Sequence, residues 1–376
     1  RQSDLAILFC GSSSASLARD YNETNCGEGF DLADLALTGA QGKLIKAIHA
    51  TGKPVILVLV TGKPFSIAWE KKHIPAILIQ WYAGEQEGSS IANILFGKTN
   101  PSGHLTVSFP QSSGHLPAYY NHLPTDRGFY HKPGSYEQPG RDYVFSSPGP
   151  LWAFGHGLTY TTFNYTDMQI QQSVDSIKVF VTVKNTGRWA GKAVPQLYVR
   201  DVFSSISTPV KQLKAFNKVA LEPGETTRVP LHFAVQDLAL TDEAGKTMVE
   251  PGSFEIMIGD ASDHILLKQT ISIGQNMAVS PCSIKEQLPE EIGKGNIIHI
   301  KGVVRDVQAT PVDKVEIYST AQQQVIGVTD QNGKYFIDAP EDDVLVFCKS
   351  GYLDEKVNVD RKNDIQITIR NKMVFP

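Results

Sequence analysis

The sequence lacks the features that would place it in a specialised class of protein. Only four of its 376 residues are cysteines, and none form a CxxC pair, so neither a disulfide scaffold nor a zinc ribbon is expected. No apolar run is long enough to cross a bilayer, the longest being Pro54 to Val60. The net charge is −4 and no block of basic residues is present, which argues against nucleic-acid binding.

Other absences concern processing and metals. Residue 1 is Arg and no signal peptide precedes the first apolar run, so we expect the chain to begin within a longer protein or after processing. The histidines share no metal-ligand spacing, and we predict neither a metal nor a cofactor. Free or buried thiols are the expected state of the cysteines (Cys10, Cys26, Cys282, Cys348), with a Cys10–Cys26 bridge as the alternative in an oxidising compartment.

What is present is an ordinary globular composition, 41% hydrophobic and 20% charged, over a length that suits two or three domains. The first hundred residues alternate short apolar runs with helical patterns. The runs are Leu5 to Phe9, Pro54 to Val60 and Ile74 to Ile79, and the helical segments are Gln41 to Ala50, Phe65 to Lys72 and Glu85 to Leu95. This alternation predicts buried strands in a parallel sheet that helices cover on both faces.

In such a sheet, ligands bind beyond the carboxyl ends of the strands. Three loops fall there: Cys10 to Thr38, Thr61 to Phe65 and Gln80 to Glu87. The first is long and rich in Gly, Ser, Asn and acidic residues. We therefore expect the chemistry of the chain at this edge, and on the first loop above all.

The remainder of the chain is predicted to be all-β. Residues 101 to 162 are irregular but rich in aromatic side chains, which indicates a packed connector. Short alternating strands follow, interrupted by a polar stretch near Gly274 to Gly295. The predicted fold is an α/β sandwich followed by two β-sandwiches. The expected domains are 1–115 (α/β), 116–163 (connector), 164–274 (β-sandwich), 275–296 (linker) and 297–376 (β-sandwich).

Several motifs occur in an order that resembles one family. The segments Gly27-Glu-Gly-Phe-Asp31, Gly84-Glu-Gln-Glu-Gly88 and Asn100-Pro-Ser-Gly103 are similar to the C-terminal α/β domain of glycoside hydrolase family 3, the β-glucosidase type. The segment Leu151 to Phe163 resembles the approach to that family's fibronectin type III-like domain, which we expect up to Ile273. The tail from about His299 to Ile369 is similar to a carboxypeptidase regulatory-like domain.

The resemblance implies a retaining, exo-acting β-glycosidase whose site lies between two domains. The family's nucleophile is an Asp on an N-terminal (β/α)8 barrel, which we expect outside this chain, so the fragment alone is expected to be inactive. The family's acid/base is a Glu on the first loop, and Glu28 occupies that place in the motif. Glu23 on the same loop is its rival, and Asp20 is a third candidate.

Glu28 has the setting that a proton donor needs. Two glycines flank it, so the backbone can approach a bound sugar closely. A carboxyl group that donates a proton near neutral pH needs a raised pKa, which burial or a neighbouring carboxylate supplies. Leu32 departs from the Arg that many members carry there. Asp31 and Asp34 are expected to be structural, with Asp34 capping a helix or binding loop amides.

Trp81 and Tyr82, on the third loop, are the candidate substrate-binding residues, because aromatic rings stack on sugars, although core packing is the alternative. β-Xylosidase and α-arabinofuranosidase are the alternative specificities. A catalytically silent carbohydrate- or protein-binding module is the alternative from another class. The family's secreted members suggest a periplasmic or extracellular address, and the expected partners are a β-linked glycoside and the barrel domain.

Overall fold

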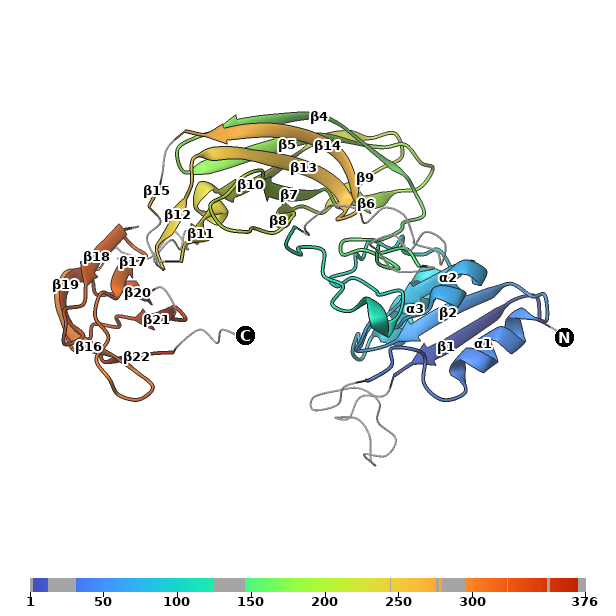
Figure 1. Ribbon diagram of the computed structural model, residues 1–376, viewed down its shortest axis with the longest axis horizontal. Helices are drawn as coiled ribbons and strands as arrows, with labels where there is room; N and C mark the ends of the chain where they lie inside the picture. Colours follow the sequence, from blue (N-terminus) through green and yellow to red (C-terminus); the bar gives the residue numbers. More distant parts are fainter. Residues whose placement is uncertain are drawn as a thin grey trace, which may run out of the picture. The chain divides into compact units, whose positions relative to one another are not determined.

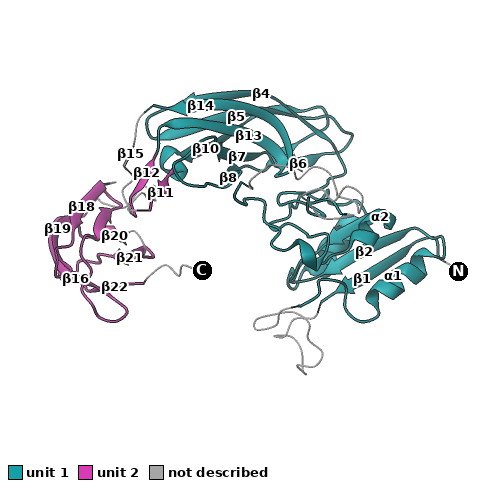
Figure 2. Cartoon of the chain, viewed as in Figure 1, with its two compact units in different colours: residues 1–238, 250–275 teal, residues 239–249, 276–376 magenta. Residues whose placement is uncertain are grey.

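The computed structural model describes residues 3–12, 32–124, 146–243, 245–274, 277–278, 295–322, 324–349 and 352–370. Two compact units divide the chain, residues 1–238 with 250–275, and residues 239–249 with 276–376 (Figure 2). The first unit combines an α/β sheet with a β-rich part, and the second is built from strands (Figure 1). The expected mixture of α/β and β-rich structure is confirmed, while the five domain boundaries stay a prediction.

The α/β part is a parallel sheet in the order β1-β2-β3, as the apolar runs predicted. Its strands and helices follow one another as β1 (Ala6–Gly11), α1 (Gln41–His49), β2 (Val55–Val60), α2 (Ala68–His73), β3 (Ala76–Ile79) and α3 (Glu87–Leu95). The central strand β2 is apolar at every position because both its neighbours and both its faces exclude water. Leu57, Val58 and Leu59 are fully buried.

The edge strand β1 differs from the expectation of a strand buried on both faces. Ala6, Leu8 and Cys10 pack into the core, but Ile7 is 39% exposed and Phe9 is 61% exposed. Successive side chains of a strand point to opposite faces, so one face of β1 is covered and the other is open. A continuous apolar run therefore did not distinguish a fully buried strand from one covered on a single face.

The connector is packed, as its aromatic residues predicted, in the parts that the structure describes. Phe109 is fully buried, pairs with Trp152 in an isolated β-bridge and meets its ring edge to face at 5.8 Å. Tyr120 stacks on Phe154 with the ring centroids 4.3 Å apart. The Tyr120 hydroxyl accepts a hydrogen bond from the Leu213 N–H at 3.0 Å, which ties the connector to β8 (Gln212–Phe216). A short 3₁₀ turn (Ser113–His115) lies between these segments.

The β-rich part of the first unit has two main antiparallel sheets, ordered β10-β5-β4 and β14-β13-β7-β8, and a small pair β6-β9. On β5 the alternate residues Ile177, Val179, Val181 and Val183 are all fully buried. This period-2 pattern is that of a sheet with one inner face. The strands are β4 (Phe163–Gln172), β5 (Ser176–Asn185), β6 (Gly191–Ala193), β7 (Gln196–Asp201), β8 (Gln212–Phe216), β9 (Val219–Leu221), β10 (Thr226–Ala234), β13 (Gly252–Ala261) and β14 (His264–Ile273).

Two glycines of the Leu151 to Phe163 segment allow close approach, Gly155 to the β-rich part and Gly157 to another stretch of the connector. Gly155 has φ +82°, and a Cβ there would lie 2.1 Å from Oε1 of the buried Gln196. A Cβ on Gly157 would lie 2.3 Å from the carbonyl oxygen of Gly103. Gln196 donates from Nε2 to the carbonyls of Gly155 at 3.0 Å and Asp260 at 2.7 Å. The glycines are therefore required by close approach.

The second unit contains a small sheet, β11-β12-β15, and two larger ones, β19-β16-β22 and β18-β17-β20-β21. Asp343, only 1% exposed, organises it by accepting hydrogen bonds from the hydroxyls of Ser319 and Thr320 and from the Val344 N–H. The strands are β11 (Leu240–Thr241), β12 (Thr247–Val249), β15 (Met277–Ala278), β16 (Ile297–Asp306), β17 (Glu316–Ser319), β18 (Gln324–Val328), β19 (Lys334–Pro340), β20 (Val344–Cys348), β21 (Glu355–Asn358) and β22 (Ile367–Ile369).

Candidate active site at the sheet edge

Three polar side chains tie together the carboxyl ends of the three parallel strands. Ser12 follows β1, Thr61 follows β2 and Tyr82 follows β3. The hydroxyls of Ser12 and Tyr82 are 2.8 Å apart, and Ser12 Oγ donates to Thr61 Oγ1 at 3.4 Å. The Tyr82 hydroxyl also donates to the Ser12 carbonyl at 3.2 Å. The edge where ligands bind in sheets of this kind is thus a connected hydrogen-bonding surface.

The start of the long first loop is fixed by α1. Gln41, in the first turn of that helix, accepts the Gly11 N–H at 2.6 Å and donates from Nε2 to the Gly11 carbonyl at 2.9 Å. Gly11 has φ +145°, and a Cβ on it would lie 1.7 Å from the Val60 carbonyl oxygen. Only glycine fits there, so the chain leaves β1 in one defined direction.

The two aromatic candidates of the third loop have different environments. Trp81 is half-buried, packs against the core and meets Phe109 edge to face at 6.0 Å. Its φ of +56° is uncommon for a bulky residue, and such strain is typical of functional sites. Tyr82 is 40% exposed and is held at its hydroxyl by Ser12. The structure thus brings Tyr82 to the polar edge and Trp81 to the core beneath it.

The floor below the edge is apolar and contains a thiol. Cys10 is buried and free, so the alternative Cys10–Cys26 bridge is not formed. Burial, followed by the nearby Glu70 carboxylate, raises the pKa of the Cys10 thiol and keeps it uncharged. Cys348, in contrast, is disulfide-bonded, which corrects the expectation that all four cysteines are free thiols.

Of the acidic residues singled out on the first loop, the structure describes only Asp34. Glu28, its rival Glu23, and Asp20 and Asp31 lie outside the described residues, so the acid/base assignment stays a prediction. Asp34 is described, and its Oδ1 accepts the Ala36 N–H at 3.0 Å and the Ser113 hydroxyl at 3.3 Å. Of the two structural roles expected for Asp34, binding a loop amide is therefore the one observed.

Sequence reasoning did not single out Ser12 and Thr61, which build the edge together with Tyr82, or Gln41, which fixes the start of the first loop. The signal was present, because Thr61 directly follows the run Pro54 to Val60 and Ser12 comes three residues after the run Leu5 to Phe9. Within the described ranges, no group of three or more His, Cys, Asp or Glu side chains is placed to hold a metal. None of the helices described is long and apolar enough to span a membrane.

Comparison with known proteins identifies the domains to which the described residues belong. Residues 1–160 match the glycosyl hydrolase family 3 C-terminal domain, and residues 193–262 match the fibronectin type III-like domain. A protein named beta-xylosidase from Formosa agariphila is 40% identical over 278 residues, which is 73% of this chain and 36% of that protein. A periplasmic beta-glucosidase from Salmonella typhimurium is 38% identical over 270 residues, 70% of this chain and 34% of that one.

The solved structures similar to this chain are also those of β-glucosidases. A β-glucosidase from Erythrobacter marinus is similar with a TM-score of 0.63 and 39% identity, over 72% of this chain and 34% of that one. The β-glucosidase from Listeria innocua in complex with isofagomine has a TM-score of 0.65 and 32% identity, over 73% and 37% of the two chains. This chain spans about a third of the length of the curated relatives it matches. It carries a glycosyl hydrolase family 3 C-terminal domain, whose sheet edge is described above, followed by a fibronectin type III-like domain.

Proposed function

We propose that this chain is the C-terminal part of a retaining, exo-acting β-glycosidase of the β-glucosidase type. The observation that carries the proposal is the hydrogen-bonded edge made by Ser12, Thr61 and Tyr82. It stands at the base of the loop that contains Glu28, within a family 3 C-terminal domain. The relatives with this domain are named β-glucosidases and β-xylosidases, which supports hydrolysis of terminal β-linked sugars.

In this proposal, Glu28 is the general acid/base. Retention of configuration needs two carboxyl groups about 5–5.5 Å apart. One attacks the anomeric carbon, and the other protonates the departing glycosidic oxygen and then takes a proton from the attacking water. Glu28 performs the second role, while an Asp on an N-terminal (β/α)8 barrel domain performs the first. The barrel is thus the required partner of this chain.

Tyr82 is the stronger of the two proposed substrate contacts. Its ring is partly exposed beside the edge, and its hydroxyl is fixed by Ser12 rather than left to rotate. A ring held in this way loses little conformational entropy when a sugar stacks on it. Trp81 already packs on Phe109, so its contribution to binding is to set the backbone of the loop from beneath.

β-Xylosidase activity is the second candidate, favoured by the 40% identity to a protein of that name. α-Arabinofuranosidase specificity is a further alternative. A periplasmic or extracellular address is also proposed, since one relative is named a periplasmic enzyme. For strands β16 to β22 we propose a carboxypeptidase regulatory-like domain, on the sequence resemblance and the presence of two sheets.

The proposal is tested with the longer protein that joins this chain to its barrel, or with a separately expressed barrel added to it. Hydrolysis of aryl β-glucosides and β-xylosides is measured for the wild type, Glu28→Gln and the matched control Glu23→Gln. Loss of a general acid/base lowers the rate by about 10²–10⁴-fold. We expect this loss in Glu28→Gln only. The same loss in Glu23→Gln, with Glu28→Gln fully active, would contradict the assignment.

A further inference from the structure

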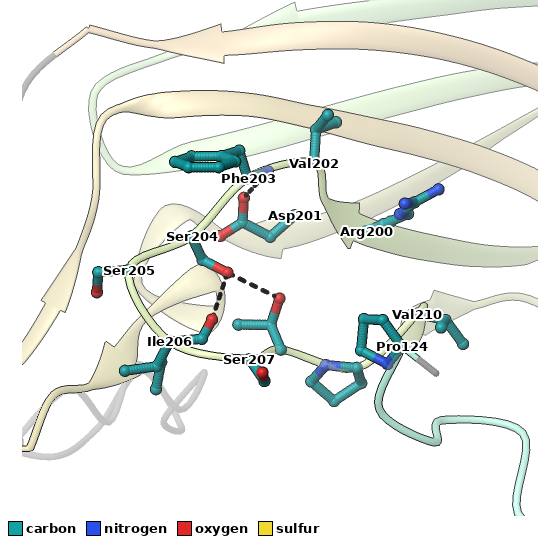
Figure 3. A pocket seen from close by; sticks show the side chains of 12 residues that line it. Pro124, Arg200, Asp201, Val202, Phe203, Ser204, Ser205, Ile206, Ser207 and Val210 are labelled. Atoms are coloured by element: carbon teal, nitrogen blue, oxygen red, sulfur yellow. Dashed lines mark hydrogen bonds between the residues drawn. The ribbon is translucent and has the colours of Figure 1, made fainter. Parts of the chain in front are cut away.

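A hollow of about 300 Å³ lies in the fibronectin type III-like domain, outside the sheet edge described above. One continuous segment, Arg200 to Val210, forms almost all of it; it begins with the last two residues of β7, and Pro124 of the connector closes one side (Figure 3). Its size is at the lower end of the range for small-molecule sites, about 300–1,000 Å³.

The loop that forms the hollow is internally braced. The Ser204 hydroxyl donates to the Ile206 carbonyl at 2.7 Å and lies 3.1 Å from the Thr208 hydroxyl, and both bonds cross the inside of the loop in Figure 3. The Ser205 N–H donates to Glu250 Oε2 at 2.9 Å, which attaches the loop to the residues just before β13. A hollow braced in this way is formed before any ligand arrives, so the entropic cost of ordering the loop on binding is small.

Two charged side chains at the hollow keep hydrogen-bonding capacity. Asp201 accepts the Phe203 N–H through Oδ1 at 3.2 Å, and its Oδ2 receives no hydrogen bond from the residues the structure describes. Arg200 is 46% exposed, and its guanidinium is 3.6 Å from Glu255, beyond hydrogen-bonding distance. A carboxylate offers acceptors and a guanidinium offers donors. Together they match a ligand whose groups both donate and accept, as hydroxyls do.

An exposed aromatic ring stands at the rim of the same hollow. Phe203 is 85% exposed, the highest value among the exposed large hydrophobic side chains of the described residues. Its neighbour Val202 is 45% exposed. An apolar ring left in water beside a polar hollow offers a flat face on which the C–H face of a sugar can stack.

The local charges decide against an anionic ligand. Among these contacts, Asp201, Glu250 and Glu255 carry negative charge and Arg200 and Lys268 carry positive charge, with the Lys268 ammonium 2.5 Å from Glu255, so one negative charge is left over. A phosphate or carboxylate would be repelled by this surplus of negative charge, whereas a neutral polyol would bond with both signs. We propose that the hollow formed by Arg200–Val210 and Pro124 is a second, non-catalytic binding site for a neutral saccharide. Phe203 stacks on the sugar ring, and Asp201 and Arg200 bond its hydroxyls.

The test uses the 376-residue chain itself, without the barrel. Cellobiose and xylobiose are titrated into the wild type, Phe203→Ala, Asp201→Ala and the control Phe216→Ala, and binding is followed by calorimetry and by NMR saturation transfer. Phe216 is 66% exposed on β8 but does not line the hollow. Truncation of an aromatic anchor is expected to weaken binding by about tenfold. Circular dichroism confirms that each variant is folded.

Saturable binding that weakens in Phe203→Ala and Asp201→Ala, but not in Phe216→Ala, supports the proposal. It is overturned by three results: no saturable binding of either sugar, equal binding by all variants, or binding that disappears when EDTA removes divalent cations. The site does not depend on the proposed catalytic function. A Glu28→Gln variant that is inactive with the barrel but still binds through Phe203 keeps the two claims apart.

Discussion

The parallel sheet and the fibronectin type III-like part of the first unit bury their strands in different ways. On β5, four alternate residues are fully buried, so the strand has a clear inner and outer face. On β1 every residue from Ala6 to Cys10 is apolar, yet Ile7 and Phe9 remain exposed. Within the described residues, β5 covers the face that its pattern marks as apolar, whereas the edge strand β1 leaves one of its two apolar faces uncovered. The difference shows that an unbroken apolar run does not mark which face of an edge strand is buried, whereas strict alternation does.

The largest expected effect on stability distinguishes the central strand β2 from the edge strand β1. Leu57→Ala, on fully buried β2, removes core packing and leaves a cavity, so it should lower the free energy of unfolding by about 2–5 kcal/mol. Ile7→Ala, on the open face of β1, should cost less than half of that value, because the side chain is already partly in water. Urea denaturation measures both. Equal losses would mean that the face of β1 is covered in solution.

A second effect tests the polar anchor of the β-rich part. Asn185 is fully buried, its Oδ1 accepts from the Thr161 hydroxyl at 2.7 Å, and its Nδ2 donates to the Trp189 and Leu221 carbonyls at 2.8 and 3.0 Å. Asn185→Ala leaves buried groups without partners, at a cost of about 1–3 kcal/mol. The control Asn217→Ala loses one long bond near the surface and should change stability by under about 0.5 kcal/mol. If Asn185→Ala leaves the free energy of unfolding unchanged, Asn185 does not anchor this part of the fold.

A third effect concerns acid stability where the connector meets the β-rich part. Burial lowers the pKa of His156, with Lys71 and His104 acting in the same direction against Asp263 and Asp260. The unfolded chain regains the ordinary value of about 6.5 and therefore binds a proton that the folded chain refuses. Stability should fall as the pH drops from about 6.5 through the lower folded pKa, and His156→Gln should flatten that fall. Thermal unfolding between pH 7 and pH 5 checks it, and an unchanged slope contradicts it.

The smallest effect probes the sheet edge. Tyr82→Phe removes the 2.8 Å contact with Ser12, which is exposed, so the loss of stability should be at most about 1 kcal/mol. Tyr119→Phe is the matched control, since Tyr119 is 54% exposed and makes no hydrogen bond with the described residues. Activity should nevertheless fall in Tyr82→Phe when the barrel is present. Identical stability and activity in both variants would leave the Ser12–Tyr82 pair without a role.

Much of the α/β fold was predictable because its signals are local. The helix expected at Gln41 to Ala50 spans Gln41–His49, and the run Pro54 to Val60 forms β2 (Val55–Val60). Strand β14 was missed because most of His264–Ile273 faces water and only its last buried positions, Ile271 and Ile273, show alternation. An edge strand with one sparse apolar face gives too weak a period to detect.

The site was less predictable, for a physical reason. The loops at the carboxyl edge followed from strand order, but the hydrogen bonds joining Ser12, Thr61 and Tyr82 depend on side chains that the fold brings together from three loops. The left-handed backbone at Trp81 also carries no sequence signal, since a bulky residue there is unexpected. Glu28 is still assigned by motif and by its glycine neighbours alone.

The most direct test of the account is chemical rescue of an acid/base variant. With the barrel present and a dinitrophenyl β-glucoside as substrate, the leaving group departs without a proton, so Glu28→Ala should still form the glycosyl-enzyme but hydrolyse it slowly. Added azide, which needs no general base, should restore turnover and yield β-glucosyl azide. The same restoration in Glu23→Ala, with none in Glu28→Ala, would contradict the central claim.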